Sequence, residues 1–284
     1  MSTLSRGVFL VSAGSLTLVV MGSLVKWLGV RLPSFELLFF RSFVGLLFVL
    51  PLFRRDPLTP FRTKRFGMHF VRGGFGAAGN ACFFWTLTHM LLADAMALQF
   101  SRPLFMIPLA LLFLREKVGG QRLAVATIGF AGILLYARPF TAGFDSDALI
   151  GAAGALFGAL VVVGIKQLAR TEQTRVIMFY YAFWSAALAA GPMLFEWRTP
   201  EAGELPVLIL IGFLGIAGQS MITSGLLLGE STALVPLDYS RVLYSAIIGY
   251  AIFGELPGLW SFAGMGLILA ASLYLVLTER RRKA

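Results

Sequence analysis

The sequence predicts an all-α membrane protein whose ten transmembrane helices form two inverted five-helix repeats, with both termini in the cytoplasm. Three features predict it: the hydropathy of the chain, the distribution of its basic residues, and an internal repeat. Of 284 residues, 58% are hydrophobic and only 13% are charged, whereas roughly a quarter of a typical soluble domain is charged. The composition argues against a soluble domain, and the net charge of +10 is not expected to mark a nucleic-acid partner.

Ten apolar segments are long enough to cross a bilayer, because a helix rises about 1.5 Å per residue and the hydrocarbon core is about 30 Å thick. The first segment stays apolar without a small-residue cleavage site, so we expect a retained helix and not a removed signal peptide. The predicted helices are 7–28, 34–53, 66–90, 94–114, 120–137, 148–168, 174–195, 205–228, 232–254 and 258–278.

The basic residues predict the orientation of these helices. Sixteen of the 24 lysines and arginines fall at the chain ends and in the alternate loops on one side. Only Arg31, Arg138 and Arg198 fall in the opposite loops. Lysine and arginine concentrate in cytoplasmic loops, so both termini are expected in the cytoplasm.

Five basic residues remain inside or at the edge of predicted helices: Lys26, Arg41, Arg72, Arg102 and Arg241. A basic side chain at the centre of a membrane helix costs at least about 2.5–3.5 kcal/mol, so each must face protein, water or a partner. Lys26 and Arg72 are close enough to a helix end to reach an interface. The other three are better candidates for an interior site.

A shift of 139 residues aligns the chain with itself without gaps from residue 73 to residue 116. A Gly-x-x-Gly-x-Ala-Gly string recurs, followed by Asn80 in the first copy and Gln219 in the second. Further matches place Ser101 and Arg102 on Ser240 and Arg241, and Glu116 on Glu255; a shift of 140 places Lys26 on Lys166 and Phe43 on Phe183.

Each repeat contains five predicted helices, so the second repeat crosses the membrane in the opposite sense to the first. We expect residues 1–140 to form the first repeat and residues 141–284 the second, together making one transport domain. Inverted repeats place a site near the bilayer midplane and allow one set of helices to rock against another. The repeat therefore predicts an alternating-access transporter.

The two five-helix repeats, the glycine-rich third helix and the proline-containing fourth helix resemble the EamA branch of the drug/metabolite transporter superfamily. The strings "FLREKVGGQRLAVATIGFAGILL" and "IFGELPGLWSFAGMGLILAASL" carry the resemblance, which covers essentially the whole chain. It implies a ten-helix inner-membrane carrier that exports amino acids or other metabolites. Within the family, the aromatic-rich sequence is similar to exporters of aromatic amino acids. Glu116 and Glu255 correspond to the acid that closes the fourth helix of each repeat.

The third and fourth predicted helices supply candidate cavity residues from the first repeat. Gln99 and Arg102 are three residues apart and so share a helix face. Pro103 and Pro108 have no amide hydrogen, so each frees a carbonyl one turn earlier and predicts a kink. Arg102 is either a cavity residue or a residue neutralised by an acid elsewhere. Asn80 and Phe84 are the candidates on the third helix, whose glycines otherwise indicate close helix packing.

The eighth and ninth predicted helices supply the corresponding residues of the second repeat. Gln219 is either a cavity amide or a contact between helices. Pro236 predicts a kink, and Asp238 lies three residues before Arg241, close enough to pair along a helix. This pair either lowers the cost of membrane insertion or binds the ammonium and carboxylate of a zwitterion. Tyr239 is an aromatic candidate for the same cavity.

No nucleotide-binding loop, metal-binding cluster or catalytic constellation is recognisable in the sequence, so we expect no cofactor, no metal and no enzymatic activity. The expected partners are a small-molecule substrate, an amino acid or related metabolite, and the lipid bilayer. The alternatives are a lipid or drug translocator of the same superfamily and, less favoured, a membrane enzyme acting on lipid-linked substrates. The sequence leaves the oligomeric state open and is compatible with a monomer.

Overall fold

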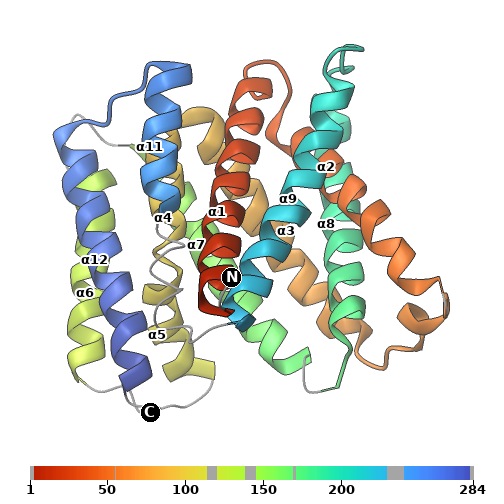
Figure 1. Ribbon diagram of the computed structural model, residues 1–284, viewed down its shortest axis with the longest axis horizontal. Coiled ribbons are helices and arrows are strands. Elements are labelled where there is room, and N and C mark those ends of the chain that lie inside the picture. The colour runs from red at the N-terminus through yellow and green to blue at the C-terminus, as the bar shows by residue number, and fades with distance from the viewer. Residues whose placement is uncertain are drawn as a thin grey trace.

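The computed structural model describes residues 3–54, 56–113, 120–137, 145–168, 171–228 and 240–281. These residues form a helical bundle (Figure 1) and contain no β-strand. The helices are α1 (Thr3–Leu28), α2 (Ser34–Val49), α3 (Phe66–His89), α4 (Leu92–Gln99), α5 (Arg102–Phe113), α6 (Gly120–Ala137), α7 (Ser146–Leu168), α8 (Thr174–Glu196), α9 (Leu205–Leu228), α11 (Ser240–Phe253) and α12 (Leu259–Arg281).

The packing of the helices follows the internal repeat. Helices α1, α2 and α3 of the first repeat correspond to α7, α8 and α9 of the second. Helix α1 packs against α9, and its equivalent α7 packs against α3, the equivalent of α9. The α2–α9 and α8–α3 pairs are related in the same way, whereas α2–α8 and α6–α12 each map onto themselves. The equivalent helices α3 and α9 run in opposite directions in Figure 1. Repeated sequence has therefore produced repeated packing.

Five helices are long and apolar enough to cross a membrane on their own: they contain residues Arg6–Leu28, Ser34–Phe53, Ser146–Ile165, Arg175–Glu196 and Leu205–Ile222. Shorter apolar helices lie at Leu123–Leu135, Ser240–Phe253 and Leu259–Ala271. The chain is thus a multi-pass helical protein. Ten crossings and cytoplasmic termini remain predictions.

The predicted helix at residues 94–114 is divided in two within the described residues. Helix α4 ends at Gln99 and α5 begins at Arg102. Pro103 has no amide hydrogen to donate to the Gln99 carbonyl, and the amides of Phe100 and Ser101 donate to Ala97 and Leu98 in tighter turns, at 3.0 and 3.1 Å. Helix α5 continues through Pro108 without a break.

The two ends of the bundle carry different loops, which define a lower and an upper side in the orientation of Figure 1. The lower side holds the α2–α3 and α7–α8 loops, and both chain ends lie in the lower half of the view. The upper side holds the α1–α2, α8–α9 and α11–α12 loops. The loops of the lower side are the basic ones, so the positive-inside rule identifies it as the predicted cytoplasmic side.

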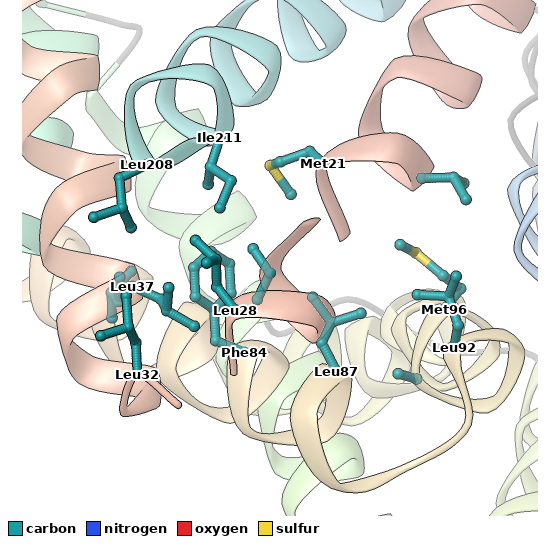
Figure 2. Close-up of a cluster of buried hydrophobic side chains, with 14 of the residues drawn as sticks. Met21, Leu28, Leu32, Leu37, Phe84, Leu87, Leu92, Met96, Leu208 and Ile211 are labelled. Carbon is teal, nitrogen blue, oxygen red and sulfur yellow. The ribbon is translucent and has the colours of Figure 1, made fainter. Parts of the chain in front are cut away.

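An apolar cluster lies where the upper ends of α1, α2, α3 and α9 meet the start of α4, and Figure 2 shows its side chains. It brings together Leu28 of α1, Leu37 of α2, Phe84 of α3, Leu92 of α4 and Ile211 of α9. All five side chains are at most 3% exposed. We call the buried residues of this cluster the upper cluster: Val19, Met21, Val25, Leu28, Leu32, Leu37, Leu38, Phe84, Leu87, Leu92, Ala95, Met96, Ala189, Leu208 and Ile211.

Candidate functional site

A cavity of about 350 Å³ lies between α2, α3, α7, α8 and α9, with the start of α5 at one wall. This volume lies within the range of pockets that hold small organic ligands. The lining residues of α2 and α7 extend from the middle of each helix to its lower end. The cavity is therefore offset to the lower side, and the upper cluster lies between it and the upper side.

Three arginines line the cavity: Arg41 of α2, Arg72 of α3 and Arg102 of α5. Among the described residues of the lining, no aspartate or glutamate accompanies them. Arg72 is 7% exposed, and the buried Nε atoms of Arg41 and Arg72 have no hydrogen-bond partner. A buried cation at membrane depth is costly and marks a functional position by default, so the cavity is suited to an anionic group.

Tyr181 of α8 lies at the centre of the polar wall. Its hydroxyl accepts a hydrogen bond from Asn80 Nδ2 at 2.6 Å. The Arg72 guanidinium carbon lies 4.7 Å from the centre of the Tyr181 ring, and Arg41 interacts with the same phenol group. Tyr181 of α8 thus contacts an amide and two guanidinium groups that are contributed by α2 and α3.

Glycines on the facing helices provide the space that these large side chains occupy. A Cβ atom at Gly76 would lie 2.6 Å from the Tyr181 ring, and one at Gly158 would lie 2.5 Å from Arg102 Nε. At Gly215 it would lie 3.2 Å from Arg41 Nε. Small residues in membrane helices usually allow backbones to approach each other. Here they also make room for the side chains of the site.

Several residues predicted for the cavity lie in its wall. Asn80, Arg102 and Gln219 line it. Gln99 is adjacent, because its Oε1 accepts a hydrogen bond from Arg102 Nη2. The role of each residue in substrate binding stays a prediction.

Other predicted residues lie elsewhere. Phe84 is 1% exposed within the upper cluster, and Arg241 lies over the Phe100 ring at 5.9 Å; neither is in the lining. Glu255 forms an ion pair with Lys26. The predictions at Glu116, Pro236, Asp238 and Tyr239 lie outside the described residues.

Sequence reasoning placed Arg72 near an interface and did not single out Tyr181. The structure instead places Arg72 in the cavity wall, because α3 turns that side chain toward Tyr181 of α8. One signal could have found Tyr181: the shift of 140 residues that aligns the first two helices of each repeat places Arg41 on Tyr181. Both positions face the cavity.

On the upper side, the α1–α2 and α8–α9 loops are joined by charged groups. Arg31 Nε donates to Glu204 Oε1 at 2.7 Å. This hydrogen bond lowers the pKa of the Glu204 carboxyl below its ordinary value and raises the pKa of Arg31. The Arg198 side chain donates to the Arg31 carbonyl at 3.0 Å, so several contacts connect the two loops.

Known proteins resemble this chain over nearly its full length. It is 30% identical to the S-adenosylmethionine uptake transporter of Rickettsia felis over 256 residues, covering 90% of this chain and 87% of the relative. It is 30% identical to the pseudopaline exporter CntI of Pseudomonas aeruginosa over 279 residues, with 98% of both chains covered. It is 31% identical to a riboflavin transporter of Brucella anthropi over 262 residues, covering 88% of this chain and 91% of the relative.

A solved crystal structure shares the fold, with a TM-score of 0.61 and 21% identity over 100% of this chain and 99% of that one. The sequence pattern of the EamA-like transporter family matches this chain twice, at residues 5–138 and 146–277. The relatives compared above are named as transporters or exporters. The chain therefore belongs to the EamA-like transporter family and is a multi-pass membrane transporter.

Proposed function

We propose that this transporter exports small organic metabolites that carry a carboxylate, with amino acids as the first candidates, by alternating access across the inner membrane. The proposal includes ten membrane crossings and cytoplasmic termini. The observation that carries it is the group of three arginines in one cavity whose described lining has no acid.

The chemistry of the cavity suits a carboxylate. A guanidinium presents paired N–H donors that match the two oxygens of a carboxylate, and such charge-assisted hydrogen bonds are stronger than neutral ones. The unsatisfied Nε atoms of Arg41 and Arg72 would gain an acceptor from a bound carboxylate. The amides of Asn80 and Gln219 can hydrogen-bond the polar groups of the same molecule.

An aromatic ring could be held beside this polar wall. Phe75 of α3 lines the cavity and stacks on Phe157 of α7, with ring centres 6.2 Å apart. Aromatic side chains favour offset or edge contacts with other rings. Aromatic amino acids are therefore the first subgroup to test. If Asp238 lies near the cavity, as the sequence predicts, its carboxylate would accept the ammonium group.

The repeat architecture supports alternating access. Two repeats that pack symmetrically can exchange roles, so that the side closed in one state opens in the other. In this structure the cavity is displaced to the lower side, and the upper cluster lies between it and the upper side. The named relatives carry different small molecules, which supports a small-molecule cargo without specifying it.

Counterflow in proteoliposomes tests the proposal. Vesicles containing the purified protein are loaded with an unlabelled amino acid, and uptake of the labelled form is measured for aromatic, aliphatic and basic amino acids. The matched ligand control is the corresponding amino acid amide, which lacks the carboxylate. We expect saturable exchange of at least one amino acid and at least about tenfold weaker exchange of its amide, because a hydrogen bond to a charged group is worth about 1.5–3 kcal/mol.

Two results would overturn the proposal. If no amino acid exchanges, the substrate assignment is wrong; if the amide exchanges as well as the amino acid, the arginines do not recognise a carboxylate. Movement of a fluorescent lipid between leaflets in the same vesicles would instead favour a lipid translocator.

A further inference from the structure

Lys26 and Glu255 form a nearly buried ion pair on the upper side. Lys26 Nζ lies 2.6 Å from Glu255 Oε1, and the two side chains are 14% and 11% exposed. The other carboxylate oxygen, Oε2, accepts a hydrogen bond from the amide of Leu92 at 2.8 Å. Lys26 Nζ also donates to the carbonyl of Met90. Every polar atom of the pair is thus engaged between three segments.

The pair joins the two repeats. Lys26 is in the last turn of α1 and Leu92 begins α4, both in the first repeat, whereas Glu255 follows α11 in the second. Gly254 has a φ of 66°, a left-handed conformation that glycine adopts without strain. It reverses the chain after α11, so that the Glu255 amide donates to the Gly249 carbonyl at 3.0 Å and the carboxylate points back toward α1.

The pair is set in the upper cluster and away from the substrate cavity. Leu92 belongs to that cluster and Phe253 packs against it, and Lys26 Nζ lies 5.6 Å from the centre of the Phe253 ring. Neither Lys26 nor Glu255 lines the cavity. A role for this pair must therefore concern the arrangement of the repeats and not direct contact with substrate.

We propose that Lys26 and Glu255 form a latch that holds the two repeats together on the upper side while the cavity is displaced to the lower side, and that separates when the cavity opens upward. This inference rests on the alternating-access part of the proposed function. It does not depend on which substrate is carried. We call this ion pair the upper latch.

The physical argument concerns the difference between two states. A buried ion pair adds little net stability compared with an apolar replacement, because both charges lose their hydration. The upper latch is favourable only where its geometry is complete, as it is here with two added hydrogen bonds to the backbone. In a state open to the upper side, water would hydrate both charges separately. Because the ion pair is close and both partners also bond the backbone, their attraction offsets the hydration that the separated charges would regain. The pair thus favours the arrangement that is closed on the upper side, as a bistable contact requires.

A second ion pair provides a matched control. Arg31 and Glu204 also join the two repeats on the upper side, but the Arg31 side chain is 37% exposed. The Glu204 side chain is 13% exposed, but water and salt reach the pair at Arg31 and weaken it. Loss of Arg31 should therefore change the balance between the two states much less than loss of Lys26.

The test measures from which side the cavity can be reached. In a Cys82→Ala background, Ile216→Cys places one reporter thiol in the cavity lining of α9. An impermeant thiol reagent is then applied to the upper or to the lower side of oriented vesicles. We expect Lys26→Met and Glu255→Gln each to raise the upper-side labelling rate by about tenfold and to lower the lower-side rate. Arg31→Gln should change either rate less than about twofold.

Two further variants separate the latch from a merely structural pair. The double variant Lys26→Gln with Glu255→Gln leaves no unpaired buried charge and adds no apolar contact that would itself hold the upper side closed. It should therefore fold, as checked by thermal unfolding in detergent, and should still show raised upper-side labelling. The exchanged pair, Lys26→Glu with Glu255→Lys, keeps the opposite charges but can neither donate to the Met90 carbonyl nor accept from the Leu92 amide. Its labelling rates should therefore lie between those of the single variants and the wild type.

Wild-type labelling rates in the folded double variant would overturn the latch. If the wild-type reporter reacts equally from both sides, alternating access itself fails. A failed amino acid exchange in the counterflow assay leaves the labelling result intact, so the two proposals can be rejected independently.

Discussion

The two repeats share their backbone packing but differ in the side chains that face the cavity. In the second repeat, Gly218 of α9 meets Gly14 of α1, where an added Cβ would lie 3.1 Å from the Gly14 carbonyl oxygen. In the first, Gly79 of α3 meets Gly154 of α7, with a corresponding distance of 3.4 Å. These contacts are equivalent under the shifts of 139 and 140 residues. Close glycine contacts therefore preserve the symmetry of the scaffold.

The two repeats differ at the positions of the charged cavity residues. Arg102 lies beside Gly158, but the position equivalent to Gly158 in the first repeat is Leu18, which packs against the upper cluster. Arg72 of the cavity corresponds to Ile211 of the same cluster. One repeat therefore contributes charge where the other contributes apolar packing. A repeated Ser-Arg pair does not by itself specify a repeated site, because the facing helix decides whether the arginine has room.

The largest expected effect on transport comes from making the two repeats alike at Gly158 and its equivalent, Leu18. Gly158→Leu introduces the residue that the first repeat has at Leu18, and even its Cβ would lie 2.5 Å from Arg102 Nε. Displacing Arg102 should reduce exchange by about 10- to 100-fold, because a hydrogen bond to a charged group is worth about 1.5–3 kcal/mol. The counterflow assay in proteoliposomes measures this loss of exchange. The reverse change, Leu18→Gly, should leave exchange within a few-fold of wild type, and a severe loss there would contradict the comparison.

The next largest effect distinguishes Arg72, which lines the cavity, from its apolar equivalent Ile211. Arg72→Ala should raise the substrate concentration for half-maximal exchange by about tenfold or more, with Arg72→Lys recovering part of the loss because it keeps the charge but not the paired donors. Ile211→Ala should instead lower the unfolding temperature, since truncating a buried isoleucine costs about 2–5 kcal/mol. An unchanged half-saturation in Arg72→Ala would show that Arg72 does not contact the substrate.

A smaller effect is expected at the hydrogen bond between Asn80 and Tyr181. Asn80→Ala removes the hydrogen bond to the Tyr181 hydroxyl and should weaken substrate binding several-fold, as expected for a net loss of about 1 kcal/mol. Tyr181→Phe removes the same bond from the other side, so the double variant should lose no more than either single variant. Binding titrations on the three variants measure this coupling. Fully additive losses would show that the two residues act separately.

The smallest effect concerns pH and the upper loops. Hydrogen bonding to Arg31 lowers the pKa of Glu204 in the folded protein, so the Arg31–Glu204 contact stabilises the fold fully above the unfolded pKa. That contribution is lost as the pH falls through the lower, folded pKa. Thermal unfolding should therefore show a modest loss of stability on acidification that is smaller in Glu204→Gln. An identical pH dependence in the two proteins would rule out this contribution.

Sequence reasoning predicted the class of fold, the repeat and the family, and these agree with the packing and with the comparisons. Hydropathy and repeated glycines are local properties, and they suffice for such predictions. The residues around the cavity were harder to predict from the sequence. Asn80, Arg102 and Gln219 were found because their polar side chains stand out in apolar helices, whereas Tyr181 is one of many membrane aromatics and its position depends on α8 facing Gly76 of α3.

The sequence by itself determined that this chain is a two-repeat helical membrane protein. The hydrophobic length of each helix and the recurrence of small residues are local properties of the sequence and do not depend on how the helices pack. Only the tertiary structure decided which charges share a cavity and which pair elsewhere. Arg41, Arg72 and Arg102 line the cavity, and Lys26 reaches Glu255. The physical reason is that a charge at membrane depth must be placed against a partner or in a space left by a neighbouring helix, and only packing creates either.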